Sequence, residues 1–215
     1  MRIFRKVIFW LHLCLALSAG VVIFIMCATG AMLAFERNII ELAESDVRTV
    51  AVDVGKRRSP LEVLGPLMRD RPDLDPTALA ISSDPGSTWS VSLGREGQIF
   101  VDPYTGAVLG EGNNGVRSVM SKLRSWHRYI ALSGDSRQAG KLATGISNII
   151  FLFLAISGVY LWFPRKLEWK RFQPVIWFRR GLKGKGRNFN WHNVIGFWTS
   201  LFLIVFTLTA TVISF

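Results

Sequence analysis

Residues 7–35 read VIFWLHLCLALSAGVVIFIMCATGAMLAF, a stretch of 29 residues without a formally charged side chain. Two further stretches share this property: residues 142–163, with 22 residues, and residues 191–215, with 25. Because about 20 apolar residues cross the core of a bilayer as a helix, each stretch predicts one transmembrane helix. The apolar run of a signal peptide is shorter, about 7–15 residues, so the first stretch is interpreted as an uncleaved anchor.

The net charge supports a membrane protein rather than a nucleic-acid-binding one. The 215 residues include 26 Lys and Arg against 15 Asp and Glu, a formal charge of +11. The excess lies in residues 1–6 and 164–190, whereas residues 36–141 carry 14 cations and 14 anions. Since short basic loops stay in the cytoplasm, we expect the N-terminus and residues 164–190 inside, and residues 36–141 outside. The charge then requires no nucleic-acid partner.

The basic loop of residues 164–190 also contains aromatic and aliphatic side chains between its cations. Such a segment is typical of the headgroup layer, where rings insert among lipids and cations face anionic headgroups. Membrane lipids are therefore an expected partner. Nucleic-acid binding is the alternative for this stretch, but the asymmetry of loop charge already accounts for its cations.

The segment outside the membrane has the pattern of a small α+β module, over residues 36–115. Ser59-Pro60 predicts a capped helix with Pro at its first position, followed by short strands separated by Gly-containing turns. The module contains no Cys and no His, which favours packing or recognition over catalysis. The predicted strands are residues 45–54, 77–83, 88–93 and 98–101, and residues 116–141 form an amphipathic segment that follows the module.

Histidine is the main candidate for chemistry in the membrane, because the three apolar stretches contain no Asp, Glu, Lys or Arg. His12 and His192 both lie near the cytoplasmic ends of helices that run outward, so they should lie at a similar depth. Two neutral imidazoles from neighbouring helices are the axial ligands of a six-coordinate haem iron. His127 lies on the outer side, in the amphipathic segment. For each histidine, the alternative is anchoring at the interface or a hydrogen bond between helices.

Small and basic residues around these histidines are compatible with a porphyrin. Ala16 and Gly196 each follow a histidine by four residues, on the same helical face, where a flat macrocycle would approach the backbone. Arg5 is close enough in sequence to His12 to pair with haem propionates. The predicted cofactor-binding residues are therefore His12, His127, His192, Ala16, Gly196 and Arg5, with the three histidines as the metal ligands.

Two strings make the chain resemble a known family. Residues 101–110 (VDPYTGAVLG) resemble the closing hairpin of PepSY domains, and residues 157–165 (SGVYLWFPR) end the second apolar stretch. With Trp126-His127-Arg128 before that stretch, the chain resembles the PepSY-associated transmembrane family from about Phe9 to Phe215. The resemblance implies a bacterial inner-membrane protein with a periplasmic PepSY-like domain over residues 36–115. One departure is Ala16, where the family tends to have Gly, since a methyl group there would crowd a porphyrin.

The expected fold class is thus an integral membrane α-helical bundle of three transmembrane helices with an inserted α+β PepSY-like domain. Members of the family include haem-containing reductases of siderophore iron, whose expected ligands correspond to His12, His127 and His192. The resemblance implies one or two b-type haems and electron transfer across or out of the membrane, to ferric iron in a siderophore or other chelate. This would make the protein a ferric-chelate reductase, without a catalytic residue of its own.

Two other functions are compatible with the sequence. The protein could be a non-catalytic, membrane-anchored regulator whose module binds a peptide or protease, or an assembly subunit that holds another membrane protein. A weak internal repeat, which superposes His12 on His192 and Thr29 on Thr209, suggests a half-unit. A second half-unit or a second copy in a homodimer is then an expected partner, and would supply the missing ligand for an outer haem at His127.

Overall fold

The structure is a computed structural model that describes residues 2–52, 55–94, 96–164 and 168–215. The chain divides into two compact units. The membrane unit consists of the residues up to Gly30 together with Arg124–Phe215, and the sheet unit consists of Ala31–Leu123.

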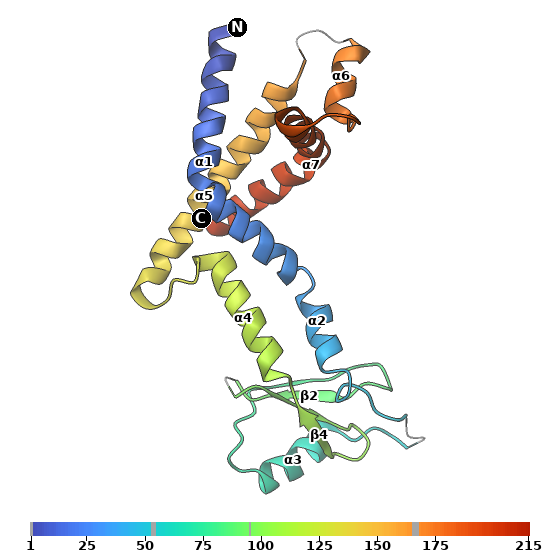
Figure 1. Ribbon diagram of the computed structural model, residues 1–215. Coiled ribbons are helices and arrows are strands. Elements are labelled where there is room, and N and C mark those ends of the chain that lie inside the picture. Colours follow the sequence, from blue (N-terminus) through green and yellow to red (C-terminus); the bar gives the residue numbers. More distant parts are fainter. Residues whose placement is uncertain (1, 53–54, 95, 165–167) are drawn as a thin grey trace. The chain divides into compact units, whose positions relative to one another are not determined.

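Three long apolar helices dominate the membrane unit. They are α1 (Arg2–Leu33), α5 (Arg137–Trp162) and α7 (Gly184–Ser214), and each contains a stretch long and apolar enough to cross a membrane. The unit also includes the end of α4 (Asn114–Tyr129), the short helix η1 (Gly134–Ser136) and α6 (Trp169–Ile176) (Figure 1). Three membrane-crossing helices with a small sheet between the first and second confirm the expected fold class.

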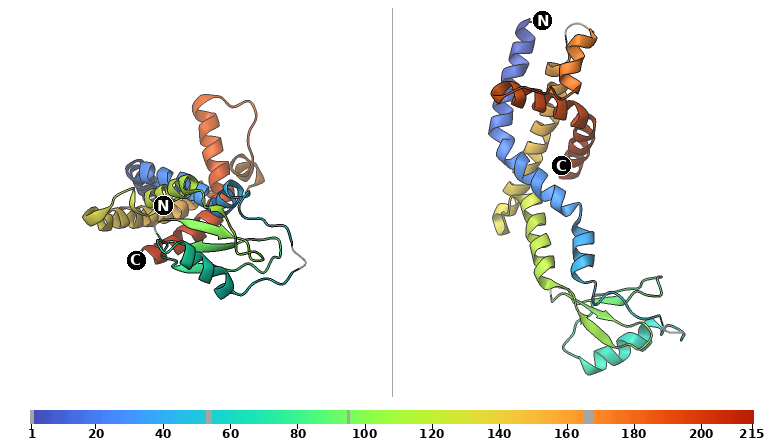
Figure 2. Two further views of the ribbon diagram at one scale, coloured as in Figure 1. Left: turned by 90° about the horizontal axis from the view of Figure 1, so that it is seen from below. Right: turned by 45° about the vertical axis from the view of Figure 1, so that its right-hand side comes forward.

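Helix α5 is the centre of the membrane unit, and α7 packs along it (Figure 2). The contact depends on small residues, because an added Cβ at Gly145 would lie 2.9 Å from the ring of Phe215. Small and polar residues let helices approach closely in a bilayer, where hydrophobic burial between helices supplies little driving force. The buried residues of α5 are Gly140, Thr144, Gly145, Ser147, Asn148 and Ser157.

A tight corner joins α4 to α5. Ile130 and Ala131 have left-handed backbones, with φ of 51° and 58°, which is uncommon for residues other than Gly. The hydroxyl of Thr144 donates to the carbonyl oxygen of Arg128 at 3.0 Å, and an added Cβ at Gly140 would collide with the carbonyl oxygen of Tyr129. The corner therefore holds the end of α4, which carries His127, directly against the start of α5.

The sheet unit contains a four-stranded antiparallel sheet in the order β1-β2-β3-β4. Its strands are β1 (Ala78–Ala80), β2 (Trp89–Ser92), β3 (Gln98–Val101) and β4 (Val108–Glu111). Alternate residues of β2 and β3 pack on Val63 and Leu67 of α3 (Pro60–Asp70) and form the core. The predicted capped helix at Ser59-Pro60 is confirmed, and its cap is a capping box in which Ser59 and Glu62 bond each other's backbone N–H.

The string DPYTG forms the turn between β3 and β4. The carboxylate of Asp102 accepts hydrogen bonds from the backbone N–H of Tyr104 at 2.7 Å and of Thr105 at 3.3 Å. Gly106 has a φ of +78°, a left-handed conformation that Gly adopts without strain, and its N–H donates to the carbonyl oxygen of Asp102. These bonds explain why the string marks the closing hairpin of the domain.

The predicted strand over residues 45–54 is wrong. Residues 36–43 form a helix, α2 (Glu36–Ala43), and the chain continues in turns, with one isolated bridge between Thr49 and Ser87. The N–H groups of Val47 and Arg48 donate to the carbonyl oxygen of Glu44, which coils the backbone at the point where alternation predicted an extended chain. Residues 53 and 54 lie outside the described residues.

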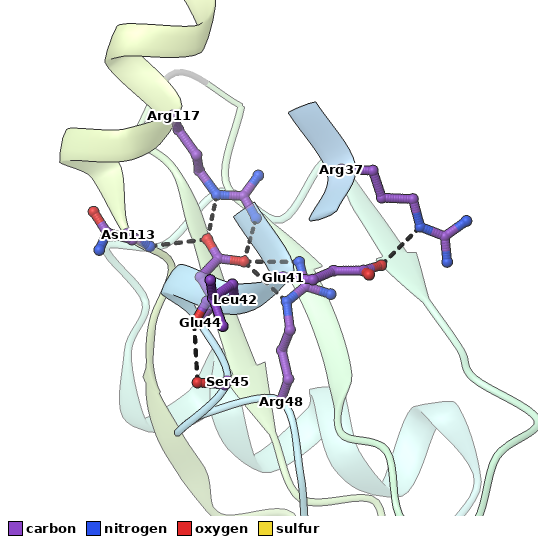
Figure 3. Close-up of polar contacts among 8 residues, drawn as sticks. All are labelled: Arg37, Glu41, Leu42, Glu44, Ser45, Arg48, Asn113 and Arg117. Carbon is purple, nitrogen blue, oxygen red and sulfur yellow. Dashed lines mark hydrogen bonds and ion pairs between the residues drawn. The ribbon is translucent and has the colours of Figure 1, made fainter. Parts of the chain in front are cut away.

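A buried carboxylate accounts for this coil (Figure 3). Glu44 is 1% exposed, and its carboxylate accepts bonds from both Arg48 and Arg117 and from the backbone N–H of Asn113. Arg48 must turn back toward Glu44 to make its bond. Burial by itself raises the pKa of Glu44, but the hydrogen bonds from Arg117, Arg48 and Asn113 outweigh it and lower the pKa below the ordinary value of 4.5.

Replacing Glu44 by Gln should destabilise the sheet unit by about 2 kcal/mol or more, because two guanidinium groups lose their buried counter-ion. In the wild type, the contribution of Glu44 to the stability of the sheet unit should be complete above pH 4.5. It should disappear as the pH falls below that value, since folding lowers the pKa of Glu44. Hydrogen exchange of β2 and β3 peptides in the full-length protein, measured against pH, checks both effects. Glu41→Gln is the control, because the Glu41–Arg37 pair is exposed. Equal protection in Glu44→Gln and wild type would contradict the expectation.

Candidate functional site

The membrane unit contains two adjoining cavities that share His12 of α1 and His192 of α7. The first, here called the apolar cavity, holds about 740 Å³ of space not filled by atoms and is partly open. The second, here called the basic cavity, holds about 1310 Å³, is also partly open, and includes Arg5 and Lys6 in its lining. The two cavities also share Gly158, Trp162 and Asn193.

The ring of His12 is held in one orientation by α5. Its Nδ1 lies 2.9 Å from the hydroxyl oxygen of Ser157, and that hydroxyl donates its own hydrogen to the carbonyl oxygen of Leu154 at 3.3 Å. The hydroxyl can accept from Nδ1–H of His12 while it donates to Leu154. In that arrangement a neutral His12 carries its free lone pair on Nε2, which is the form that a metal-ligating imidazole needs.

Small residues surround the two histidines. Ala16 and Gly196, expected from their spacing, line the apolar cavity together with Gly158. An added Cβ at Gly196 would have no atom within 4 Å, and one at Gly158 would lie 3.5 Å from Cε1 of His12. Gly196 therefore borders open space, while Gly158 lets the imidazole lie directly against α5.

Arg5 lies at the end of α5. Its guanidinium donates to the carbonyl oxygen of Phe163 at 3.3 Å and to that of Leu161. The last carbonyls of a helix lack partners within the helix, so Arg5 satisfies groups that would otherwise be exposed to lipid. Arg5 also lines the basic cavity, where Lys6 is a second cation.

Trp162, which lines both cavities, belongs to an aromatic cluster. The ring of Trp162 stacks on that of Phe197, with centroids 4.5 Å apart and planes 7° from parallel. The edge of Phe172 in α6 packs against Trp162 at 5.9 Å. The Nε1 of Trp162 is buried and has no hydrogen-bond partner among the described residues. These contacts fix the indole beside the cavities and leave one donor unsatisfied.

His127 lies at a different level from the other two histidines and lines neither cavity. Its Nδ1 lies 3.0 Å from the carbonyl oxygen of Met26 and 3.2 Å from the hydroxyl of Thr29, both in α1. Thr29 is 17 residues from His12, or about 25 Å along the helix. The structure thus brings His12 and His192 together and separates His127 from them.

Sequence patterns had not singled out Ser157, Trp162 or Asn193 as site residues. Ser157 and Trp162 belong to the string SGVYLWFPR, so that string carried a usable signal. Asn193 follows His192, and its side-chain amide lines both cavities. Burying a polar side chain in a membrane-crossing helix costs free energy, so such a residue is a candidate for a functional role.

The family model of the PepSY-associated TM region matches residues 9–215. The chain belongs to the PepSY-associated transmembrane family. The resemblance inferred from the two strings is thereby confirmed, and the match includes all three histidines and the residues shared by the two cavities. No curated protein matches the chain.

The contact between His127 and α1 depends on Gly30, because an added Cβ there would lie 2.9 Å from Cε1 of the imidazole. Gly30→Ala should lower the thermal stability of the membrane unit in detergent, at a cost of about 1–3 kcal/mol for overpacking. Gly20→Ala is the matched control, since nothing lies within 4 Å of an added Cβ there. In a His127→Ala background, Gly30→Ala should no longer lower the thermal stability, because the imidazole is absent. An unchanged loss of stability in that background would show that the two residues do not touch.

Proposed function

We propose that this protein binds haem b in the membrane unit and moves electrons across or out of the membrane, to ferric iron in a siderophore or another chelate. One observation carries the proposal: His12 and His192, from the first and last of the long helices, line the same two cavities. Two imidazoles are the ligand set of a six-coordinate haem. The described residues contain no group of three or more His, Cys, Asp or Glu that would hold a bare metal ion instead.

The residues around the histidines fit a flat, mostly apolar group with acidic substituents. Gly158, Ala16 and Gly196 leave room beside the helices, and the remaining wall of the apolar cavity is hydrophobic. Ala16 stands where the family tends to have Gly, and its methyl group lies in the wall of the apolar cavity. The hydrophobic wall residues are Phe151, Leu154, Ala155, Val159, Phe197 and Leu203.

Each polar residue has a definable role in this proposal. Ser157 would be a positioning residue, because its hydroxyl, 2.9 Å from Nδ1 of His12, would accept from Nδ1–H and leave Nε2 free to bind iron. Lys6 and the amide of Asn193 in the basic cavity would bind the propionate carboxylates. Arg5 would contribute positive charge there while its guanidinium stays on the carbonyls of α5. The haem, when bound, supplies the one-electron chemistry of its iron.

The direction of transfer follows from the proposed topology. With basic residues 1–6 and 164–190 inside, the His12–His192 end of the unit would lie at the cytoplasmic face of a bacterial inner membrane. Residues 36–141, with the sheet unit, would then lie in the periplasm. Helix α6 carries exposed Trp169 next to cations, as expected of a segment in contact with lipid headgroups.

A single chain provides ligands for one haem. His127 lies about 25 Å from His12 along α1, so it belongs to a separate, outer site. Its Nδ1 is held by Met26 and Thr29, which leaves Nε2 available, as at His12. A second haem at His127 would take its other axial ligand from a second copy or half-unit.

The absorption spectrum of the purified protein tests the proposal. Protein expressed with haem should show a Soret band and split visible bands after reduction, and His12→Ala or His192→Ala should remove them. Ser157→Ala should lower haem affinity by about 10–100-fold, the usual effect of losing a group that orients a ligand. Ser147→Ala, at another buried serine of α5, is the matched control, and His127→Ala should leave the inner haem in place.

A colourless wild-type protein after haem-supplemented expression would overturn the proposal. Haem bound equally by wild type and by the His12→Ala, His192→Ala double variant would overturn the ligand assignment. In the first case the membrane helices would serve as an anchor, and the module would be the functional part.

A further inference from the structure

The sheet unit contains a polar groove on the face of the sheet opposite α3. Alternation along β2 and β3 places Trp89, Val91, Ile99 and Val101 on α3, and Ser90 and Phe100 on the other face. Both of these residues line the groove, together with residues of α2 and of the turns after it. The groove holds about 1080 Å³ of space not filled by atoms and is open on one side.

The floor of the groove is a fixed guanidinium over an aromatic ring. Phe100 is 2% exposed, and Cζ of Arg48 lies 5.1 Å from the centre of its ring. Nε and Nη2 of Arg48 bind the buried carboxylate of Glu44 at 3.1 and 2.7 Å (Figure 3). The third nitrogen, Nη1, makes no hydrogen bond within the part of the chain that the structure describes. The Nη1–H of Arg48 is therefore a donor whose side chain is already held in place by Glu44, so binding a ligand would not require ordering of this guanidinium.

Two hydroxyl groups in the groove lack partners. Thr88 is only 7% exposed, yet its hydroxyl makes no hydrogen bond to any described residue, and the hydroxyl of Ser90 makes none either. Other hydroxyls of the lining are occupied, such as that of Ser45 by the carbonyl oxygen of Leu42 and that of Ser87 by the carboxylate of Asp84. Among the described residues, the buried side-chain donors without a partner are the indole N–H groups of Trp89 and Trp162, so the hydroxyl of Thr88 is accessible and can bond a ligand in the groove.

The charge of the lining favours a singly charged anionic group. Arg37 and Arg48 against Glu41 give two cations and one anion, or a net charge of +1. Arg37 pairs with Glu41 at 2.7 Å on the rim, and its side chain is 88% exposed. A phosphate dianion would call for a second unpaired guanidinium or a bidentate one, whereas two donors of Arg48 already bind Glu44. A carboxylate needs only a few donors and one net positive charge.

We propose that this groove binds the carboxylate group of a ligand, with Arg48 Nη1 and the hydroxyls of Thr88 and Ser90 as donors. Arg37 at the rim attracts the anion through its positive charge. The inference is independent of haem binding, because every residue it uses lies in the sheet unit. A carboxylate can belong to a small acid or to the C-terminus of a peptide, and these two sources share the recognition chemistry.

Titration calorimetry on the full-length protein in neutral-lipid nanodiscs tests this site. Lactate and pentaglycine represent the two sources of the carboxylate, and methyl lactate and pentaglycine amide are their counterparts without a carboxylate. At least one of the two acids should bind while its counterpart without the carboxylate does not. Which of the two acids binds identifies the source. Inorganic phosphate is a third probe and should bind more weakly than that acid.

Variants locate the binding. Thr88→Val preserves the shape of the side chain and should weaken binding about tenfold, the usual loss for one hydrogen bond to a charged group. Ser90→Ala, two residues after Thr88, should weaken binding to a similar extent. Arg37→Gln should weaken binding less, because Arg37 lies at the rim. Arg71→Gln is the matched control for Arg37→Gln, because Arg71 pairs with Asp73 outside the groove.

Three results would overturn the proposal: no binding of either acid at millimolar concentration, equal binding of a counterpart without the carboxylate, or unchanged affinity in both hydroxyl variants. Tighter binding of phosphate at the same residues would overturn the preference for a carboxylate. Hydrogen exchange of the β2 and β3 peptides shows for each variant that the sheet unit remains folded, so that a lost signal reports on the groove.

Discussion

The hydrogen bond between His12 Nδ1 and Ser157 Oγ is the contact on which the candidate site depends. Helix α1 has few close neighbours, and it is joined to α5 at discrete points: this bond, the guanidinium of Arg5 on the last carbonyls of α5, and the ring of Phe4 against Tyr160. In lipid, apolar surface gains little from contact with other apolar surface, so such polar contacts and close packing determine how helices associate. The same bond that joins α1 to α5 also orients the ring of His12 beside the cavities. The association of these helices and the orientation of the ring therefore have one cause.

Polar groups find their hydrogen-bond partners differently in the two units. In the sheet unit, the buried carboxylate of Glu44 is surrounded by two guanidinium groups and a backbone N–H, and all of its partners come from the same unit. In the membrane unit, hydroxyls of Thr and Ser bond to carbonyls of their own helices, as Thr207 does to Leu203. Two buried side-chain donors of the described residues have no hydrogen-bond partner: the indole N–H of Trp162, beside the cavities of the membrane unit, and that of Trp89, in the core of the sheet unit.

Parts of the fold were predictable because their causes are local. The three membrane helices follow from the length of their apolar stretches, the start of α3 follows from Ser59, Pro60 and Glu62, and β3 follows from its flanking turns. The prediction failed at residues 45–54, where alternation indicated a strand. Glu44 binds Arg117, which is 73 residues away, and the chain coils so that Arg48 can reach the same carboxylate. No local pattern contains that partner.

The same distinction between local and long-range causes applies to the candidate site. Sequence alone determined which side chains are available, since three histidines lie within or beside apolar stretches that contain no Asp, Glu, Lys or Arg. The strings at residues 101–110 and 157–165 indicated the family. Only the tertiary structure decided that His12 and His192 line common cavities, that Ser157 orients one of them, and that His127 belongs to a different level of α1. The physical reason is that helical periodicity specifies a residue's position on its own helix, whereas the faces that meet are chosen by small residues and hydrogen bonds between segments far apart in the chain.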